Sequence, residues 1–310
     1  MRSSQRVLLI VLLGLAACHG GSGSSTDVAP PPSAAPSEAV PAAPPPDASA
    51  LFGTPLPAAS VATFQNPNGL PAYDGPVGSI EGTITVRGDA PPDSLQDFGR
   101  CPGAQGTYGK LFREGAPLPD GSRPLADALV AVTGYSGFYV RELAESRKVH
   151  IDNCAFDTRT VDMTIGQRLE IDNRSTALYA PALAQAPMPA LMVAPPNNAD
   201  PVKLYPLKPA YYTLIDRLGA EWMTADVYVL SYPLHTVSRL DGHYRIDGVP
   251  VGKVDVNTRL AAIQQNATKK VEVHANVVST VDLQLNYKRG MEAPRVISDG
   301  GQVPPHAVIH

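Results

Sequence analysis

Apolar and polar residues alternate in many short segments between residues 79 and 287. An alternation with a period of two places every second side chain on one face, which is typical of a β-strand with one buried side. The segments span residues 79–86, 129–133, 148–152, 160–163, 167–173, 226–230, 236–238, 243–246, 253–257, 270–274 and 280–285, and weaker ones span 203–205 and 211–214. Many short strands predict an all-β fold, either one β-sandwich or two in tandem.

Glycine and proline separate the expected strands. Residues 88–124 are rich in Gly, Pro and Asp and predict a loop, and the prolines of residues 180–201 exclude a long helix there. The dipeptide Asp241-Gly242 predicts a tight hairpin turn. The whole chain has 310 residues, which is enough for one or two domains.

The chain begins with a short apolar segment behind a basic flank. Residues 7–17 are apolar, eleven in all, and they follow Arg2 and Arg6. A bilayer-spanning helix needs about 20 residues, so this segment predicts a signal peptide. Residues 15–18, Leu-Ala-Ala-Cys, resemble a bacterial lipobox, which implies that residues 1–18 end at a lipidated Cys18.

An ordinary secretory signal that happens to contain a cysteine is the alternative to the lipobox. The residue after Cys18 is His19 rather than Asp. By analogy with the sorting of enteric lipoproteins, this predicts an anchor in the outer membrane that faces the periplasm or the cell surface. The membrane is then a partner through the lipid.

Two segments lack the composition of a folded domain. Residues 19–75 are dominated by Ala, Pro and Ser, and no Lys or Arg occurs between Arg6 and Arg87. Such a segment buries too little apolar surface to offset its ordering entropy, so we predict a disordered, semi-rigid tether. Residues 288–310 lose all periodicity and predict a disordered tail.

Charge and cysteine content narrow the possibilities further. The 25 Lys and Arg against 29 Asp and Glu give a net charge of -4, which offers no electrostatic reason to bind nucleic acid. Once Cys18 is lipidated, Cys101 and Cys154 remain in an oxidising compartment and predict one disulfide. Such a bridge stabilises the fold by ~4 kcal/mol at most. Two buried free thiols are the alternative.

Three passages resemble known families. Residues 165–173 (Ile-Gly-Gln-Arg-Leu-Glu-Ile-Asp-Asn) resemble the strand before the first copper-ligand loop of cupredoxins, and residues 221–230 (Glu-Trp-Met-Thr-Ala-Asp-Val-Tyr-Val-Leu) resemble the strand after their second loop. Residues 241–253 (Asp-Gly-His-Tyr-Arg-Ile-Asp-Gly-Val-Pro-Val-Gly-Lys) resemble the carboxypeptidase regulatory-like, transthyretin-like module. The order matches bacterial periplasmic proteins that join the two. The resemblance implies a cupredoxin-like Greek-key sandwich over residues 76–232 and a smaller transthyretin-like sandwich over 233–287.

The resemblance also locates the copper ligands of that family on this chain. Blue copper needs two imidazoles and one thiolate, with a weak axial thioether. The corresponding positions are Tyr179, Ala182, Arg217, Ala220 and, for the thioether, Met223. Only the methionine is retained, so the resemblance implies a lost metal site and no cofactor. Trp222 and Met223 are then expected in the core, with Tyr179 in the volume that the metal would use.

Other catalytic patterns are not found. The sequence has no Gly-x-Ser-x-Gly elbow, phosphate loop or dinucleotide fingerprint. Asp152, Asp157, Asp162 and Asp172 are expected on solvated faces rather than as paired catalytic carboxylates. Tyrosines recur between residues 205 and 232, where they either form an exposed contact face or lie buried between the sheets: Tyr205, Tyr211, Tyr212, Tyr228 and Tyr232.

These observations favour a non-enzymatic envelope lipoprotein. We expect a binding or structural module on a flexible stalk, with a protein or glycan partner. The alternative hypothesis is a cupredoxin that binds copper or transfers electrons through ligands that the pattern does not reveal.

Overall fold

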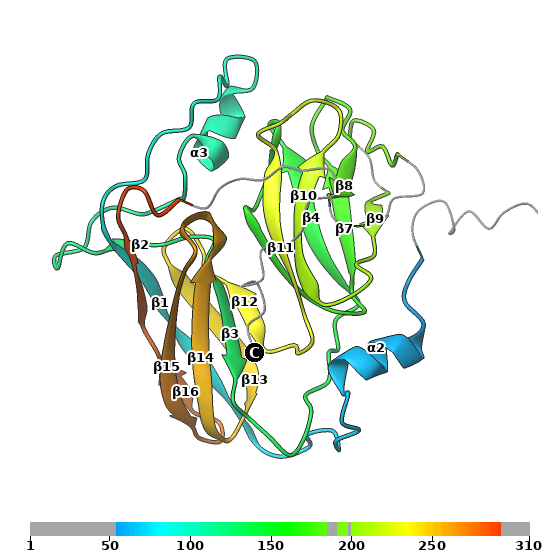
Figure 1. The fold of residues 1–310 in the computed structure, drawn as a ribbon, viewed down its shortest axis with the longest axis vertical. Helices are drawn as coiled ribbons and strands as arrows, with labels where there is room; N and C mark the ends of the chain where they lie inside the picture. The colour runs from blue at the N-terminus through cyan, green and yellow to red at the C-terminus, as the bar shows by residue number, and fades with distance from the viewer. Residues whose placement is uncertain (1–53, 185, 187–190, 198–199, 293–310) are drawn as a thin grey trace, which may run out of the picture. The chain divides into compact units, whose positions relative to one another are not determined.

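The computed structural model describes residues 54–184, 186, 191–197 and 200–292. The expected signal peptide, Cys18 and most of the expected tether and tail lie outside these residues. The described part is an all-β protein, as the sequence predicts, with two separate apolar cores (Figure 1). No helix within it is both long and apolar enough to cross a membrane.

The first core lies between two four-stranded sheets. One sheet has the order β6-β11-β10-β8 and the other β5-β4-β7-β9. The strands are β4 (Ser146–Asp152), β5 (Ala155–Phe156), β6 (Thr160–Thr164), β7 (Arg168–Asn173), β8 (Pro181–Leu183), β9 (Val202–Leu204), β10 (Ala210–Asp216) and β11 (Thr224–Leu230). Pairs β6–β11 and β4–β7 are parallel, and the others are antiparallel.

Three short helical segments complete this part of the chain. The 3-10 helix η1 (Pro102–Ala104) and helix α3 (Gln105–Tyr108) bring Ala104 and Tyr108 into the first core. Helix α2 (Ala58–Gln65) brings the partly buried Phe64 against it. The last part of the expected tether, residues 19–75, is therefore ordered by packing that its composition does not reveal.

The second core is built from strands at both ends of the described chain. In one sheet β13-β1-β16 are neighbours and β2 and β17 also pair with β1, while the other has the order β12-β3-β14-β15. The strands are β1 (Val77–Gly88), β2 (Arg123–Pro124), β3 (Leu129–Thr133), β12 (His235–Val237), β13 (His243–Pro250), β14 (Gly252–Leu260), β15 (Gln265–Val273), β16 (Val278–Thr280) and β17 (Leu283–Tyr287). A second 3-10 helix, η2 (Ala261–Ile263), joins β14 to β15.

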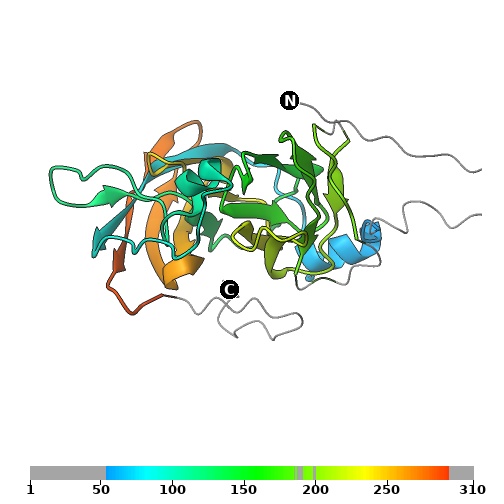
Figure 2. The ribbon, with the colours of Figure 1, turned by 90° about the horizontal axis from the view of Figure 1, so that it is seen from above.

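This pairing differs from the expected division into residues 76–232 and 233–287. Strand β1 pairs with β13 and β17 rather than with the first sandwich, so early and late parts of the chain lie side by side (Figure 1, Figure 2). The reason is the apolar face of β1, on which Ile80 and Ile84 are fully buried. That face needs a partner sheet, and strands 243–287 supply it. The first sandwich is thus inserted between β3 and β12.

One buried carboxylate joins the two parts. Asp127 lies just before β3, only 5% exposed, and accepts hydrogen bonds from Arg113 at 2.7 Å (Nε) and 2.5 Å (Nη2). Its backbone N–H donates to the Ser238 carbonyl at 3.0 Å, next to β12, and its carbonyl accepts from Thr160 Oγ1 of β6 at 2.7 Å. One residue therefore holds β3, β12 and β6 together. Its φ of 63° is left-handed, which is costly for a residue with a Cβ.

Arg159 supports the same junction. Its Nη1 donates to the Lys110 carbonyl at 2.9 Å, and its guanidinium carbon lies 5.8 Å from the ring centroid of Tyr108. A guanidinium at this distance from an aromatic ring is attracted to the π-face. The loop that carries α3 is thereby fixed to the start of β6.

Replacing Asp127 with alanine should leave the Arg113 charge buried without its partner. Loss of one partner of a buried pair costs about 3–5 kcal/mol. The free energy of unfolding, measured with guanidinium chloride, should fall by that amount.

The control for Asp127→Ala is Glu145→Gln. Glu145 pairs with Arg168 at 3.4 Å, but its side chain is 82% exposed. Exposed pairs contribute little because water screens them, so this variant should unfold close to the wild-type midpoint. Equal midpoints for wild type and Asp127→Ala would contradict the role of Asp127.

Candidate functional site

The positions that the resemblance assigns to copper ligands lie at one end of the first sandwich. Tyr179 forms a β-bridge with Ala194, and Ala182 pairs with Ile215 at the end of β10. The N–H of Arg217 donates to the Ala180 carbonyl at 3.0 Å, and that of Met223 donates to the Ala220 carbonyl at 2.8 Å. The three segments that carry these positions are therefore neighbours.

A buried amide ties two of these segments together. Asn173, at the end of β7, is 1% exposed. Its Nδ2 donates to the carbonyls of Ala177 at 2.7 Å, Ala194 at 2.9 Å and Pro195 at 3.0 Å. Its Oδ1 accepts from the backbone N–H of Ser175 at 3.0 Å. The side chain thus fixes the loop after β7 against residues 191–195.

A carboxylate holds the third of these segments, the loop between β10 and β11, against its neighbour. Asp216, at the end of β10, accepts from the Ala180 N–H at 2.7 Å through Oδ1 and from the Ala220 N–H at 3.2 Å through Oδ2. The loop between β10 and β11 is therefore closed by its own side chain and joined to the strand beside it. Neither Asn173 nor Asp216 stands out in the sequence, because only the folded loops bring their partners near.

The donor set at this end does not fit a blue-copper site. The ligand positions hold a phenol, a guanidinium and two methyl groups instead of imidazoles and a thiolate, and Met223 is fully buried in the core. Across residues 54–184, 186, 191–197 and 200–292, no three His, Cys, Asp or Glu side chains gather closely enough to hold a metal ion.

Four apolar side chains on the segments at this end are exposed. Residues 191–194 alternate, so that Met192 and Ala194 enter the core while Leu191 and Val193 remain 56% and 45% exposed. Leu178 and Leu218, on the neighbouring segments, are 49% and 47% exposed. We call Leu178, Leu191, Val193 and Leu218 the apolar end. Exposed Leu and Val side chains on adjoining segments are typical of an interaction surface.

The expected disulfide is confirmed and lies beside this end. Cys101 and Cys154 are bridged, with their Cα atoms 5.8 Å apart. Trp222, one residue before Met223, donates from Nε1 to the Cys154 carbonyl at 3.0 Å. The Trp222 ring also meets Phe98 edge-on, with centroids 5.7 Å apart. The partly buried tryptophan therefore packs between the two cysteine-bearing loops.

A separate cluster around His235 is arranged like a catalytic triad, but solvent and substrate cannot reach it. His235 lies between Asp162 (Nδ1 to Oδ2, 2.6 Å) and Thr164 (Nε2 to Oγ1, 3.0 Å). Thr164 Oγ1 also donates to Glu142 Oε2 at 2.6 Å. The His235 side chain and Thr164 are fully buried. This cluster joins β6 to β12 and is structural.

The expectation that Asp162 lies on a solvated face is wrong. Its carboxylate is largely buried, because β6 runs along β12 and faces His235. Arg147 also approaches it, at 3.2 Å. The spacing of aspartates in the sequence does not reveal this, since the partner lies more than seventy residues away.

The tyrosines of residues 205–232 do not form an exposed face. Tyr212 and Tyr228 are buried, and Tyr211 donates to Asp226 at 2.5 Å. Burial, together with the neighbouring charge of Asp226, raises the pKa of Tyr211 and of Tyr228. Of the two alternatives for these residues, burial between the sheets is the one the structure adopts.

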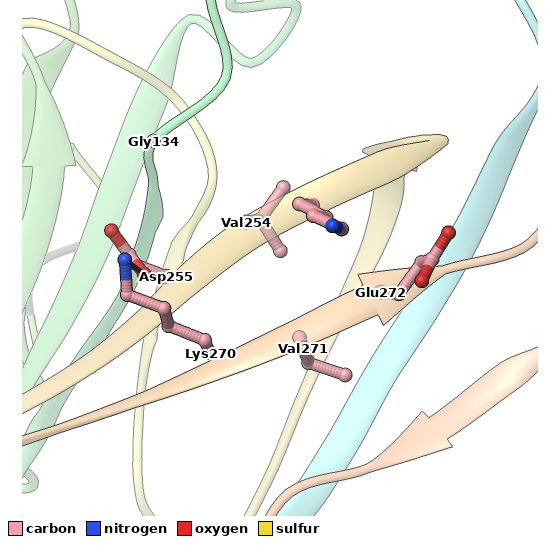
Figure 3. Close-up of a pocket in the computed structure, with 7 residues that line it drawn as sticks. Gly134, Val254, Asp255, Lys270, Val271 and Glu272 are labelled. Carbon is pink, nitrogen blue, oxygen red and sulfur yellow. Dashed lines mark ion pairs between the residues drawn. The ribbon is translucent and has the colours of Figure 1, made fainter.

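A shallow groove crosses β14 and β15 on the second sandwich (Figure 3). It is lined by Gly134, Lys253, Val254, Asp255, Lys270, Val271 and Glu272. Lys270 Nζ lies 3.8 Å from Asp255 Oδ1, and Lys253 pairs in register with Glu272. The charges are balanced within the groove, so it has no electrostatic preference for a cation or an anion.

Comparison with known proteins gives structural similarity only. No family model matches the chain, and no curated protein matches its sequence. Among solved structures, amicyanin from Paracoccus versutus is 14% identical over 28% of this chain and 84% of its own, with a TM-score of 0.24. The Cu(I) form of an amicyanin mutant is 17% identical over 32% and 97%, also with a TM-score of 0.24.

The Asp162 carboxylate should make stability sensitive to acid. Burial by itself raises its pKa, but the hydrogen bond and charge of His235 and the charge of Arg147 outweigh burial, so the pKa is lowered. The carboxylate therefore contributes stability above the unfolded value of about 3.9, and this contribution is lost as the pH falls through the folded value.

Urea unfolding of wild type and Asp162→Asn across pH 7 to 2 measures this contribution. The difference in unfolding free energy should be constant above about pH 5 and shrink below about pH 4. A difference that does not change with pH would show that Asp162 is not ionised in the fold.

Proposed function

We propose that this protein is a non-enzymatic lipoprotein of the bacterial cell envelope, and that its apolar end binds a protein partner. The observation that carries the proposal is the combination of exposed Leu and Val side chains with fixed loops beneath them. Asn173 and Asp216 hold the backbone of these loops by hydrogen bonds. A surface that is ordered before binding loses less entropy when a partner docks.

The chemistry of the surface favours a protein partner over a glycan. Sugar rings stack on exposed aromatic faces and need several hydrogen-bonding side chains around them. The apolar end instead presents aliphatic groups, with the exposed Arg217 and Glu221 at its margin. An apolar centre with a charged margin is the usual anatomy of a protein–protein interface.

The mode of attachment follows from the lipobox. A lipidated Cys18 would hold the chain at the membrane, and residues 19–53 would act as a spacer before the described part begins at residue 54. An outer-membrane location facing the periplasm or the cell surface belongs to the same proposal.

Removing the exposed leucines should abolish partner binding. The variant Leu178→Ser with Leu218→Ser exposes hydroxyls where a partner would bury methyl groups. The mature chain is incubated with an envelope extract of the source bacterium and cross-linked, and adducts are quantified by mass spectrometry. We expect one reproducible adduct to fall about tenfold or more, the effect of losing about 1.4 kcal/mol or more of binding energy.

The matched control for this binding test is Leu143→Ser with Leu240→Ser. These leucines are 89% and 63% exposed and lie outside the apolar end. The control should retain the adduct at the wild-type level. Equal loss in both variants, or equal retention, would refute the apolar end as the binding surface, whereas an adduct of two copies of the chain would identify the partner as itself.

The anchor is tested separately with Cys18→Ser. A serine cannot accept the thioether-linked lipid, so the variant should move from the membrane pellet to the soluble envelope fraction. The measurement is immunoblotting of both fractions, with mass spectrometry of the mature N-terminus. A wild-type protein that is soluble and unlipidated would overturn the anchor and leave the ordinary secretory signal.

A further inference from the structure

The disulfide ends in a hairpin turn whose two central residues have left-handed backbone conformations. Asn153 and Cys154 form the two-residue turn between β4 and β5, with φ of 48° and 61°. Asparagine is well suited to the first position of such a turn, but the second is normally glycine, because a Cβ in the left-handed region is crowded. Cys154 occupies that position with its sulfur bonded to Cys101. A non-glycine residue in this region indicates a constraint imposed from outside the turn.

The second cysteine-bearing loop lies directly on this turn. A Cβ on Gly103 would lie within 3.0 Å of the Asn153 backbone and closer still to its side chain, so only glycine permits the approach. The Cys101 N–H donates to the Phe98 carbonyl at 2.8 Å. The bridge therefore fixes the loop of residues 98–104 and the turn as one unit.

Trp222 connects that unit to the apolar end. It binds the Cys154 carbonyl through Nε1 and contacts Phe98 through its ring. Trp222 itself lies in a tight turn. The Met223 N–H donates to the Ala220 carbonyl at 2.8 Å, and the Thr224 N–H donates to the Trp222 carbonyl at 2.8 Å. Ala220 is in turn bound by Asp216, two residues before Leu218.

We infer that the Cys101–Cys154 disulfide is a redox-sensitive clamp that keeps Trp222, and through it the loop of residues 217–223 that carries Leu218 of the apolar end, in the ordered conformation. The inference rests on the proposed function in one respect only, namely that the apolar end binds a partner. Reduction frees Cys154 to leave the left-handed region. The Cys154 carbonyl then turns away from the indole, and the 217–223 loop loses one of its supports.

The reductant is a dithiol, and the exchange is balanced. One thiolate of the dithiol attacks a cysteine sulfur, and its second thiol resolves the mixed disulfide. The protein S–S bond breaks, a disulfide forms within the reductant, and two electrons and two protons end on Cys101 and Cys154. Both cysteines are partly exposed, so a small dithiol can reach them.

The change is confined to this region, because other contacts hold the two loops. Phe98, Ala104 and Tyr108 are buried in the first core, and the Tyr108 hydroxyl accepts from the Phe156 N–H at 3.3 Å. Loss of the bridge therefore leaves these loops attached. Asn173 and the Asp216–Ala180 hydrogen bond lie outside residues 217–223 and remain, whereas the Ala220 N–H that Asp216 accepts belongs to the loop that loosens.

The protein contains one tryptophan, so its fluorescence reports on Trp222 alone. The full mature chain is treated with dithiothreitol at neutral pH, and emission and amide hydrogen exchange are followed. We expect the emission maximum to shift to longer wavelength. Exchange in residues 217–224 should rise about tenfold or more, while exchange in β14 and β15 stays unchanged.

Two variants make the result specific. Cys101→Ser with Cys154→Ser should show the reduced-state exchange without reductant and should not respond to dithiothreitol. Trp222→Phe removes the indole N–H but keeps a ring against Phe98, so its 217–224 segment should exchange faster even when the bridge is intact.

Unchanged exchange in residues 217–224 after full reduction would overturn the inference. An equal rise in β14 and β15 would also overturn it, because the bridge would then stabilise the whole fold and not act locally. If the loop responds but cross-linking to the partner does not change, the clamp stands and the proposed binding surface fails. The two hypotheses are thus tested separately.

Discussion

The buried Asp127 carboxylate is the interaction on which the arrangement of this protein depends. Asp127 lies where the chain passes between the two cores. Its carboxylate pairs with Arg113, and its backbone N–H and carbonyl bond to Ser238 and Thr160. A charge in such a position must be paired, because removing a carboxylate from water costs several kcal/mol when nothing compensates it. The pairing with Arg113 meets that requirement, while the backbone N–H and carbonyl of Asp127 join the start of β3 to Ser238 beside β12 and to Thr160 of β6. The His235–Asp162–Thr164 cluster fastens β6 to β12 a second time, two to four residues beyond Thr160 along β6.

The loops beneath the apolar end are held on this frame by hydrogen bonds to backbone groups. Loops that end a β-sandwich leave several N–H and C=O groups without strand partners, and each such group is costly if it is buried unpaired. Asn173 and Asp216 supply those partners at the apolar end, and Trp222 connects the same region to the disulfide. The result is an ordered loop region that exposes Leu and Val side chains. Order of this kind is what distinguishes a binding surface from an apolar patch on a mobile loop.

Several features of the site could be expected from the sequence, and others could not. The pairing of Cys101 with Cys154 follows from counting cysteines in a chain whose N-terminus predicts secretion, and the burial of Met223 follows from its place at the start of an apolar strand. The roles of Asn173, Asp216 and Asp127 do not follow, because a polar residue in a loop is ordinary until its partners are known. Asp162 illustrates the same limit, since its position among other aspartates suggests solvent exposure although His235 covers it.

The sequence by itself determined the local structure and the class of fold. Alternation with a period of two fixes which side chains share a face, and the turn residues fix where each strand ends, so the all-β architecture can be read without coordinates. Only the tertiary structure decided which strands pair. Strand β1 has the same pattern whether it joins the sheet next in sequence or the one formed by residues 243–287, and the choice depends on which sheet offers an apolar face of matching length and twist. Strand pairing over more than 150 residues is a property of packing, and no local pattern encodes it.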